Sequence, residues 1–133
     1  MGRLEYWSED QILFVNNLAN TKFDSIEVID AAFAEIDRFW KKRCGKKVYC
    51  IIDYTNLIIE PGLLPYWSEK RTAAVKMYSV TAVRFGADLG TRVALRAMAI
   101  KTHVASNVYA TREEAIAVVR GISQGTIQVA HAG

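Results

Sequence analysis

Residues 84–92 (RFGADLGTR) combine basic, hydroxyl and glycine residues at a spacing that suits the binding of an anion. Glycines let the backbone approach a ligand closely, and a helix that begins after this turn would offer free backbone N–H groups. The residues expected to contact the anion are two arginines that flank the turn and one hydroxyl, namely Arg84, Arg92 and Thr91. The pattern is neither GxGxxG nor GxxxxGKS/T, so the alternative is a tight strand-to-helix turn in which Asp88 caps the helix and pairs with an arginine.

A second group of polar residues follows the apolar run 48–53 (VYCIID). Asp53 ends this run, where α/β proteins place working carboxylates, but it equally suits a cap for the following loop or a partner for Arg84. Neither His103, late in a predicted helix, nor His131, near the end of the chain, is well placed to assist it. Without a GxSxG or HExxH motif or a telling carboxylate pair, we expect a protein that is not an enzyme and holds no cofactor or metal. The loop residues that we expect to contact a ligand or partner are Asp53, Tyr54, Asn56 and Glu60.

The helix predicted over residues 61–78 contributes one further candidate, Trp67. Adjacent residues on a helix cannot both face the core, so either Tyr66 or Trp67 should be exposed. An exposed aromatic side chain would suit a partner-binding surface, and the alternative is a ring that lies flat on the molecule. The inner stripe of this helix is apolar except at Arg71, and it comprises Leu64, Trp67, Arg71, Val75 and Tyr78.

The elements that must position these residues follow the order β-β-α-β-α-β-α-β-α. Alternation and apolar periodicity predict strands near 3–7, 11–16, 48–53, 80–85 and 107–110, and helices near 25–43, 61–78, 91–104 and 112–122. Strands joined through helices lie parallel, whereas the first two form an antiparallel hairpin. The sequence therefore predicts a single α/β domain over residues 1–122 with a mixed sheet, followed by a flexible tail over 123–133. Whether helices cover one face of the sheet or both stays open.

Composition narrows the class of protein further. A net charge of +3 over 133 residues does not indicate nucleic acid binding. No apolar run reaches the length of about 18 residues that spans a bilayer. Acidic residues near the start, Glu5, Glu9 and Asp10, do not fit a signal peptide, so we expect a cytoplasmic protein whose two cysteines are reduced.

From residue 48 to 122 the chain resembles the STAS domain, the fold of anti-sigma-factor antagonists and of related lipid-carrier-like proteins. The similar segments are VYCIIDYTNL, VTAVRF and NVYATREEAIAVV. The last of these fits the family pattern (F/Y)-x-(S/T)-x-E-E-A through Tyr109, Thr111, Glu113, Glu114 and Ala115. This resemblance implies a regulatory module that docks on an anti-sigma-factor or kinase-like protein partner, and we expect a homodimer.

The family's phosphorylated Ser or Thr precedes the helix after the central strand, where this chain has Glu60-Pro61-Gly62. Neither Thr55 nor Ser68 stands at the matching place, so we expect no phosphoacceptor serine. The alternative function, suggested by the lipid-carrier-like branch, is a small-molecule or lipid carrier that binds an anionic group at the Arg84–Arg92 loop.

Overall fold

The computed structural model of the protein describes residues 3–88, 93, 97 and 107–126. Within these residues, β1 (Leu4–Trp7), β2 (Ile12–Val15), β4 (Val48–Asp53), β6 (Ser79–Phe85) and β7 (Val108–Tyr109) form one sheet in the spatial order β1-β2-β4-β6-β7. β1 runs antiparallel to β2, and every other neighbouring pair is parallel. The predicted α/β class and the mixed sheet are confirmed, and VYCIID (β4) is the middle strand of the sheet.

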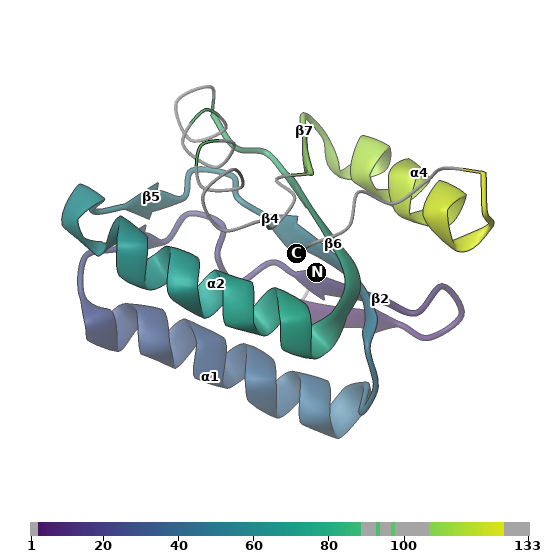
Figure 1. Ribbon diagram of the computed structural model, residues 1–133, viewed down its shortest axis with the longest axis horizontal. Helices are drawn as coiled ribbons and strands as arrows, with labels where there is room; N and C mark the ends of the chain where they lie inside the picture. Colours follow the sequence, from purple (N-terminus) through teal and green to yellow (C-terminus); the bar gives the residue numbers. More distant parts are fainter. Residues whose placement is uncertain (1–2, 89–92, 94–96, 98–106, 127–133) are drawn as a thin grey trace.

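Helices cover both faces of this sheet, which the sequence left open (Figure 1). On β2, Leu13 and Val15 pack toward α1 (Ile26–Arg43) and α2 (Leu64–Tyr78). Ile12 and Phe14 point the other way and pack toward α4 (Arg112–Ser123). This alternation follows from the pleat, because successive side chains of a strand lie on opposite faces. The sheet therefore separates two apolar layers.

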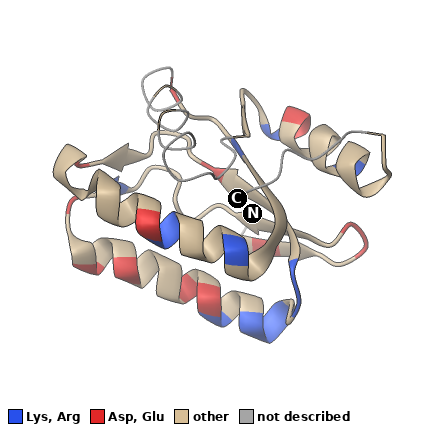
Figure 2. Ribbon diagram, in the orientation of Figure 1, with Lys and Arg blue, Asp and Glu red and all other residues tan. Residues whose placement is uncertain are grey.

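Capping residues stabilise the ends of α1 and the start of α4 (Arg112–Ser123). The Ser25 hydroxyl accepts a backbone N–H from the first turn of α1 at 3.2 Å, and Gly45, with φ of +71°, follows its end. Basic residues gather in the last turn of α1, near the negative end of the helix dipole (Figure 2). Thr111 caps α4 by accepting the N–H of Glu114 at 3.2 Å, and the Glu114 carboxylate accepts the N–H of Ala110 at 3.3 Å. The Glu114 carboxylate therefore reaches back to the residue before the N-cap, an arrangement related to the capping box.

The structure adds a feature that the sequence did not predict, a small parallel sheet of β3 (Lys22–Phe23) and β5 (Ile58–Ile59). It joins the loop after β4 to the segment that leads into α1. A short 3-10 helix, η1 (Pro61–Leu63), continues from this loop into α2. The predicted start of the second helix at Pro61 is thus confirmed, although its first turn is a 3-10 helix. Most of the helix predicted near 91–104 lies outside the described residues, as do residues 127–133 of the predicted tail.

Gly86 stands where the chain leaves β6 and passes close to the loop after β4. Its φ is +79°, and a Cβ atom at this position would lie 2.3 Å from Thr55 Oγ1 and 3.1 Å from the Thr55 backbone nitrogen. Real Cβ atoms do not approach other atoms so closely, so only glycine fits here. Gly45 has a similar φ of +71°, but a Cβ atom there would meet nothing within 4 Å.

Substitutions of these two glycines distinguish the energetic cost of a steric clash from the cost of backbone strain. Gly45→Ala should lower the free energy of unfolding by about 1–2 kcal/mol, the cost of a left-handed conformation for a residue with a Cβ atom. Gly86→Ala should cost about 1–3 kcal/mol more, because the methyl group also displaces the Thr55 loop. Urea unfolding of both variants measures the difference. Equal losses would show that Thr55 does not constrain this turn.

Candidate functional site

The loops predicted to form the site do meet at the carboxyl edge of the parallel strands. The Tyr54 backbone N–H donates to the Phe85 carbonyl at 2.9 Å, which joins the loop after β4 to the end of β6. Asp53 accepts the Thr55 N–H at 2.8 Å and so caps its own loop. Asn56, with φ of +55°, donates from its side chain to Asn20 Oδ1 at 2.8 Å. Both polar residues therefore shape the loop by hydrogen bonds within the protein.

Arg84, expected to face an anion in the loop, instead points into the apolar layer beneath α1 and α2. It has the same strand parity as Ala82, which lies in that layer, and its side chain is 0% exposed. Its Nε donates to the Tyr54 hydroxyl at 3.3 Å. Thr91 and Arg92 lie outside the described residues. Among described residues, the predicted site is therefore divided between an exposed loop, which includes Glu60, and a buried arginine.

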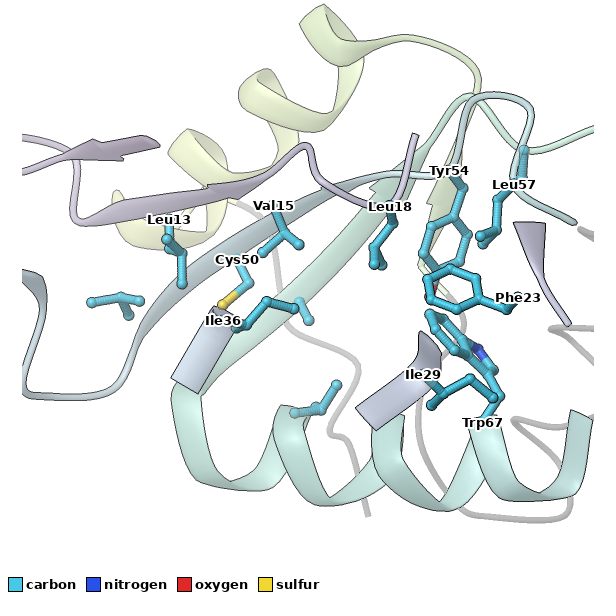
Figure 3. Packing of buried hydrophobic residues seen from close by; sticks show 14 residues of the cluster. Leu13, Val15, Leu18, Phe23, Ile29, Ile36, Cys50, Tyr54, Leu57 and Trp67 are labelled. Carbon is cyan, nitrogen blue, oxygen red and sulfur yellow. The ribbon is translucent and has the colours of Figure 1, made fainter. Parts of the chain in front are cut away.

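The prediction that Trp67 contributes to an exposed aromatic surface on α2 is wrong. The side chain is 1% exposed, and its ring lies beside the rings of Phe23 and Tyr54 (Figure 3), with centroid distances of 5.0 and 6.2 Å. The Phe33 ring also packs against it, with a centroid distance of 5.2 Å. Tyr66 is half-buried and donates from its hydroxyl to Asp30 on α1 at 2.5 Å. The helix thus turns Trp67 into the core and uses Tyr66 to join the two helices.

Beside Trp67 lies a cavity of about 40 Å³ between the helices and the sheet. Its described lining is mainly apolar and contains no Asp or Glu side chain. The lining residues come from β2 and the residues after it, α1, β4, α2 and β6, and they are Leu13, Val15, Leu18, Phe33, Ile36, Cys50, Ile52, Tyr54, Trp67, Arg71, Ala74, Val75, Tyr78, Ser79 and Ala82. A cavity needs about 10–15 Å³ to hold one water molecule, so this one has room for a small ligand.

Arg71 is the one cationic side chain in the described lining of this cavity. Its side chain is 3% exposed, and within the described part of the chain neither of its Nη atoms has a hydrogen-bond partner. Burial, followed by the positive charge of Arg84, lowers the pKa of Arg71 to about 10, whereas Tyr54 opposes this shift. The guanidinium group still carries its proton at neutral pH. A buried charge without a partner costs several kcal/mol, so this arrangement favours the arrival of an anion.

The sequence contained a signal for Arg71, which was not among the predicted site residues. It interrupts the inner stripe of the helix over 61–78, and the structure confirms that stripe, since Trp67 and Val75 are buried with it. A basic residue on an inner face most often extends its charge to the surface or pairs with an acid. The structure shows Arg71 in the core beside a cavity, which the pattern alone did not indicate.

Neither the thiol nor the serine hydroxyl in the described lining is activated as a nucleophile. Burial raises the pKa of the Cys50 thiol to about 12, so this thiol is protonated at neutral pH and is a poor nucleophile. Ser79 donates from its hydroxyl to the Val75 carbonyl at 2.6 Å, which occupies its proton. Arg71 can donate two parallel hydrogen bonds, which is the geometry that carboxylate and phosphate groups accept.

Comparisons with known proteins do not assign this chain to a family: no family model, curated protein or solved structure matches it. In the part of the chain that the structure describes, no helix is both long and apolar enough to cross a membrane. The same residues contain no group of three or more His, Cys, Asp or Glu side chains that could hold a metal ion.

An unpaired charge in the core has a measurable effect on stability. Arg71→Met keeps the unbranched shape of the side chain and removes the charge, so it should raise the free energy of unfolding of the ligand-free protein by about 1–3 kcal/mol. Tyr54→Phe is the control, and it should have the opposite effect. It removes the hydroxyl that accepts a hydrogen bond from Arg84, so it should lower the free energy of unfolding by about 1–3 kcal/mol. Urea unfolding at pH 7, after refolding to remove any retained ligand, tests both. A loss of stability in Arg71→Met would contradict an unpaired charge.

Proposed function

We propose that this chain is a non-catalytic binding module whose cavity between α1, α2 and the sheet takes a small ligand with an anionic group. One observation carries the proposal: Arg71 is 3% exposed, borders an apolar cavity, and has two Nη atoms without a hydrogen-bond partner among described residues. An anion would satisfy these donors and offset the cost of burying the charge. This function corresponds to the carrier alternative from the sequence, with the anionic group beside Arg71 rather than at the 84–92 loop.

The resemblance to STAS-like proteins is compatible with this function. Its lipid-carrier-like branch has an apolar ligand pocket between helices and sheet, and it does not require a phosphoacceptor. Ser68 is 4% exposed, so a kinase could not reach its hydroxyl without local unfolding. Glu60 and Pro61, at the position where the family carries its phosphorylated residue, are exposed and have no hydroxyl. These features support binding of a ligand over control by phosphorylation.

A second candidate function, docking on a protein partner, is supported by the loop after β4. Ile58 on β5 is 56% exposed, and Glu60, two residues further along the loop, is also exposed. A single exposed apolar residue is common on protein surfaces, so the resemblance to the STAS family is what points to this loop. The STAS-like expectation of a regulatory, dimeric protein that binds an anti-sigma-factor or kinase-like regulator would use this surface.

Ligand binding is tested by thermal unfolding with a panel of small carboxylates, phosphates and sulfonates at constant ionic strength. An anion that binds the cavity should stabilise the native protein by about 2.7 kcal/mol at 100 times its Kd, a rise in Tm of about 10 °C. Arg71→Met should show no such rise, because its cavity lacks the cation. A panel in which no anion raises Tm more in the wild type than in Arg71→Met would refute the function.

Partner docking is tested by affinity capture and light scattering with Ile58→Thr and Glu60→Arg. Both variants should lose a partner, or the dimer, that the wild type retains, because each changes the exposed loop and leaves the core intact. Glu113→Arg, an exposed charge reversal on α4, is the matched control and should retain it. Equal capture by all four proteins would show that this loop is not the docking surface.

A further inference from the structure

The cavity's size and lining limit what the ligand can be. About 40 Å³ of space accommodates about three groups of the size of a water molecule. Apart from Arg71, the described side chains that line it are aliphatic, aromatic or thiol groups, or hydroxyls, and the Ser79 hydroxyl is already bonded. A ligand that fits therefore has one charged group and a short apolar part.

The position of Arg71 within α2 indicates whether the site suits a phosphate or a carboxylate. Phosphate sites in proteins usually rely on helix N-termini or on successive free backbone N–H groups. Arg71 lies in the interior of α2 (Leu64–Tyr78), where backbone N–H groups are bonded within the helix. Arg84 does not line the cavity and uses its Nε on Tyr54. A single guanidinium group among apolar side chains can donate two parallel hydrogen bonds and balance one negative charge. A carboxylate is planar and carries one negative charge, so it matches this site.

A groove of about 330 Å³ lies on the outer side of α1 and α2. Groove and cavity share Phe33, Ala74 and Tyr78. Tyr66 and Tyr78 donate from their hydroxyls to Asp30 and Asp37 of α1, which joins the helices at both ends of the groove.

The two aspartates in this groove do not present free negative charge to an entering anion. Lys70 pairs with Asp30 at 3.5 Å, and Lys41 pairs with Asp37 at 2.8 Å. Of the three residues that line both the groove and the cavity, Ala74 has the smallest side chain. A ligand that passes between the two spaces would meet least obstruction there.

We infer that the ligand is a short aliphatic monocarboxylate, of about two to four carbons, that passes between α1 and α2 at Ala74 and binds Arg71 through both carboxylate oxygens. This inference rests on the proposed function and adds the chemical class of the ligand and its path. No covalent step is involved.

The class of ligand is tested by calorimetry and thermal unfolding with propionate, propionamide, methyl phosphate and octanoate at fixed ionic strength. Propionate should bind the wild type, and propionamide, which has the same shape without the charge, should not. Arg71→Lys keeps the charge and loses the fork, so its affinity for propionate should fall about tenfold. Tighter binding of octanoate than of propionate would overturn the inference.

The same experiment separates the two proposals. Methyl phosphate that raises Tm through Arg71, with no effect of propionate, would refute the carboxylate and leave an anion-binding cavity. If neither these ligands nor the wider panel raises Tm in the wild type, both proposals fail.

The path is tested by a matched pair of substitutions on α2. Ala74→Leu fills the passage and should slow the association of propionate about tenfold or more, because the added side chain occupies space through which the ligand passes. Ala73→Leu adds the same group at an exposed position that lines only the outer groove, and it should change the association rate by less than about twofold. Circular dichroism and the Tm of each ligand-free variant establish that it is folded, and stopped-flow fluorescence measures the rates. Equal association rates in the two variants would overturn the path.

Discussion

The burial of β4 on both faces is the constraint on which the remaining structure depends. Val48 and Cys50 pack under α1 and α2, while Ile51 packs under α4, so this strand can occupy only the interior of the sheet. Its parallel neighbours β2 and β6 then bring their carboxyl ends to the same edge. At this edge the backbone bond of 2.9 Å from Tyr54 to Phe85 fixes where the chain turns back under the helices. The position of the cavity follows, because Tyr54 forms part of its wall.

Much of this architecture could be predicted because its signals are local. A continuous apolar run such as VYCIID indicates a strand that is buried on both faces. Ser25 and Thr111 cap the helices that they precede. The pair β3 and β5 could not be predicted in this way. Each strand has two residues, too few to show a period, and the pairing of Lys22 with Ile58 depends on how α1 packs. For Trp67, the apolar stripe of its helix did predict an inward orientation, but its packing against Phe23 and Phe33 from distant parts of the chain could not be predicted.

The site was harder to predict than the fold, because both arginines look ordinary in the sequence. Arg84 adjoins a glycine-containing turn, and only the side of the sheet on which Ala82 packs shows that its side chain points inward. Because helices cover both faces, strand parity alone did not indicate which layer would receive it. Arg71 was visible as an interruption of an apolar stripe, but a pattern on one helix does not show whether an acid from another element meets it. Spacing therefore pointed to the loops after β4 and β6, and it did not select Arg71, which borders the cavity.

On the proposed function, Tyr54 connects the cavity with the exposed loop. Its ring lines the cavity, its hydroxyl accepts a hydrogen bond from Arg84 at 3.3 Å, and the loop that begins with it ends at Glu60. An anion beside Arg71 would reduce the repulsion between the two buried guanidinium groups, which is part of the reason that the pKa of Arg71 is lowered. A ligand shifts a conformational equilibrium only by as much as it prefers one conformation over another. The loop would therefore respond to the ligand only if Tyr54 and Arg84 change their arrangement when the charge is paired, and in that case the two candidate functions belong to one mechanism.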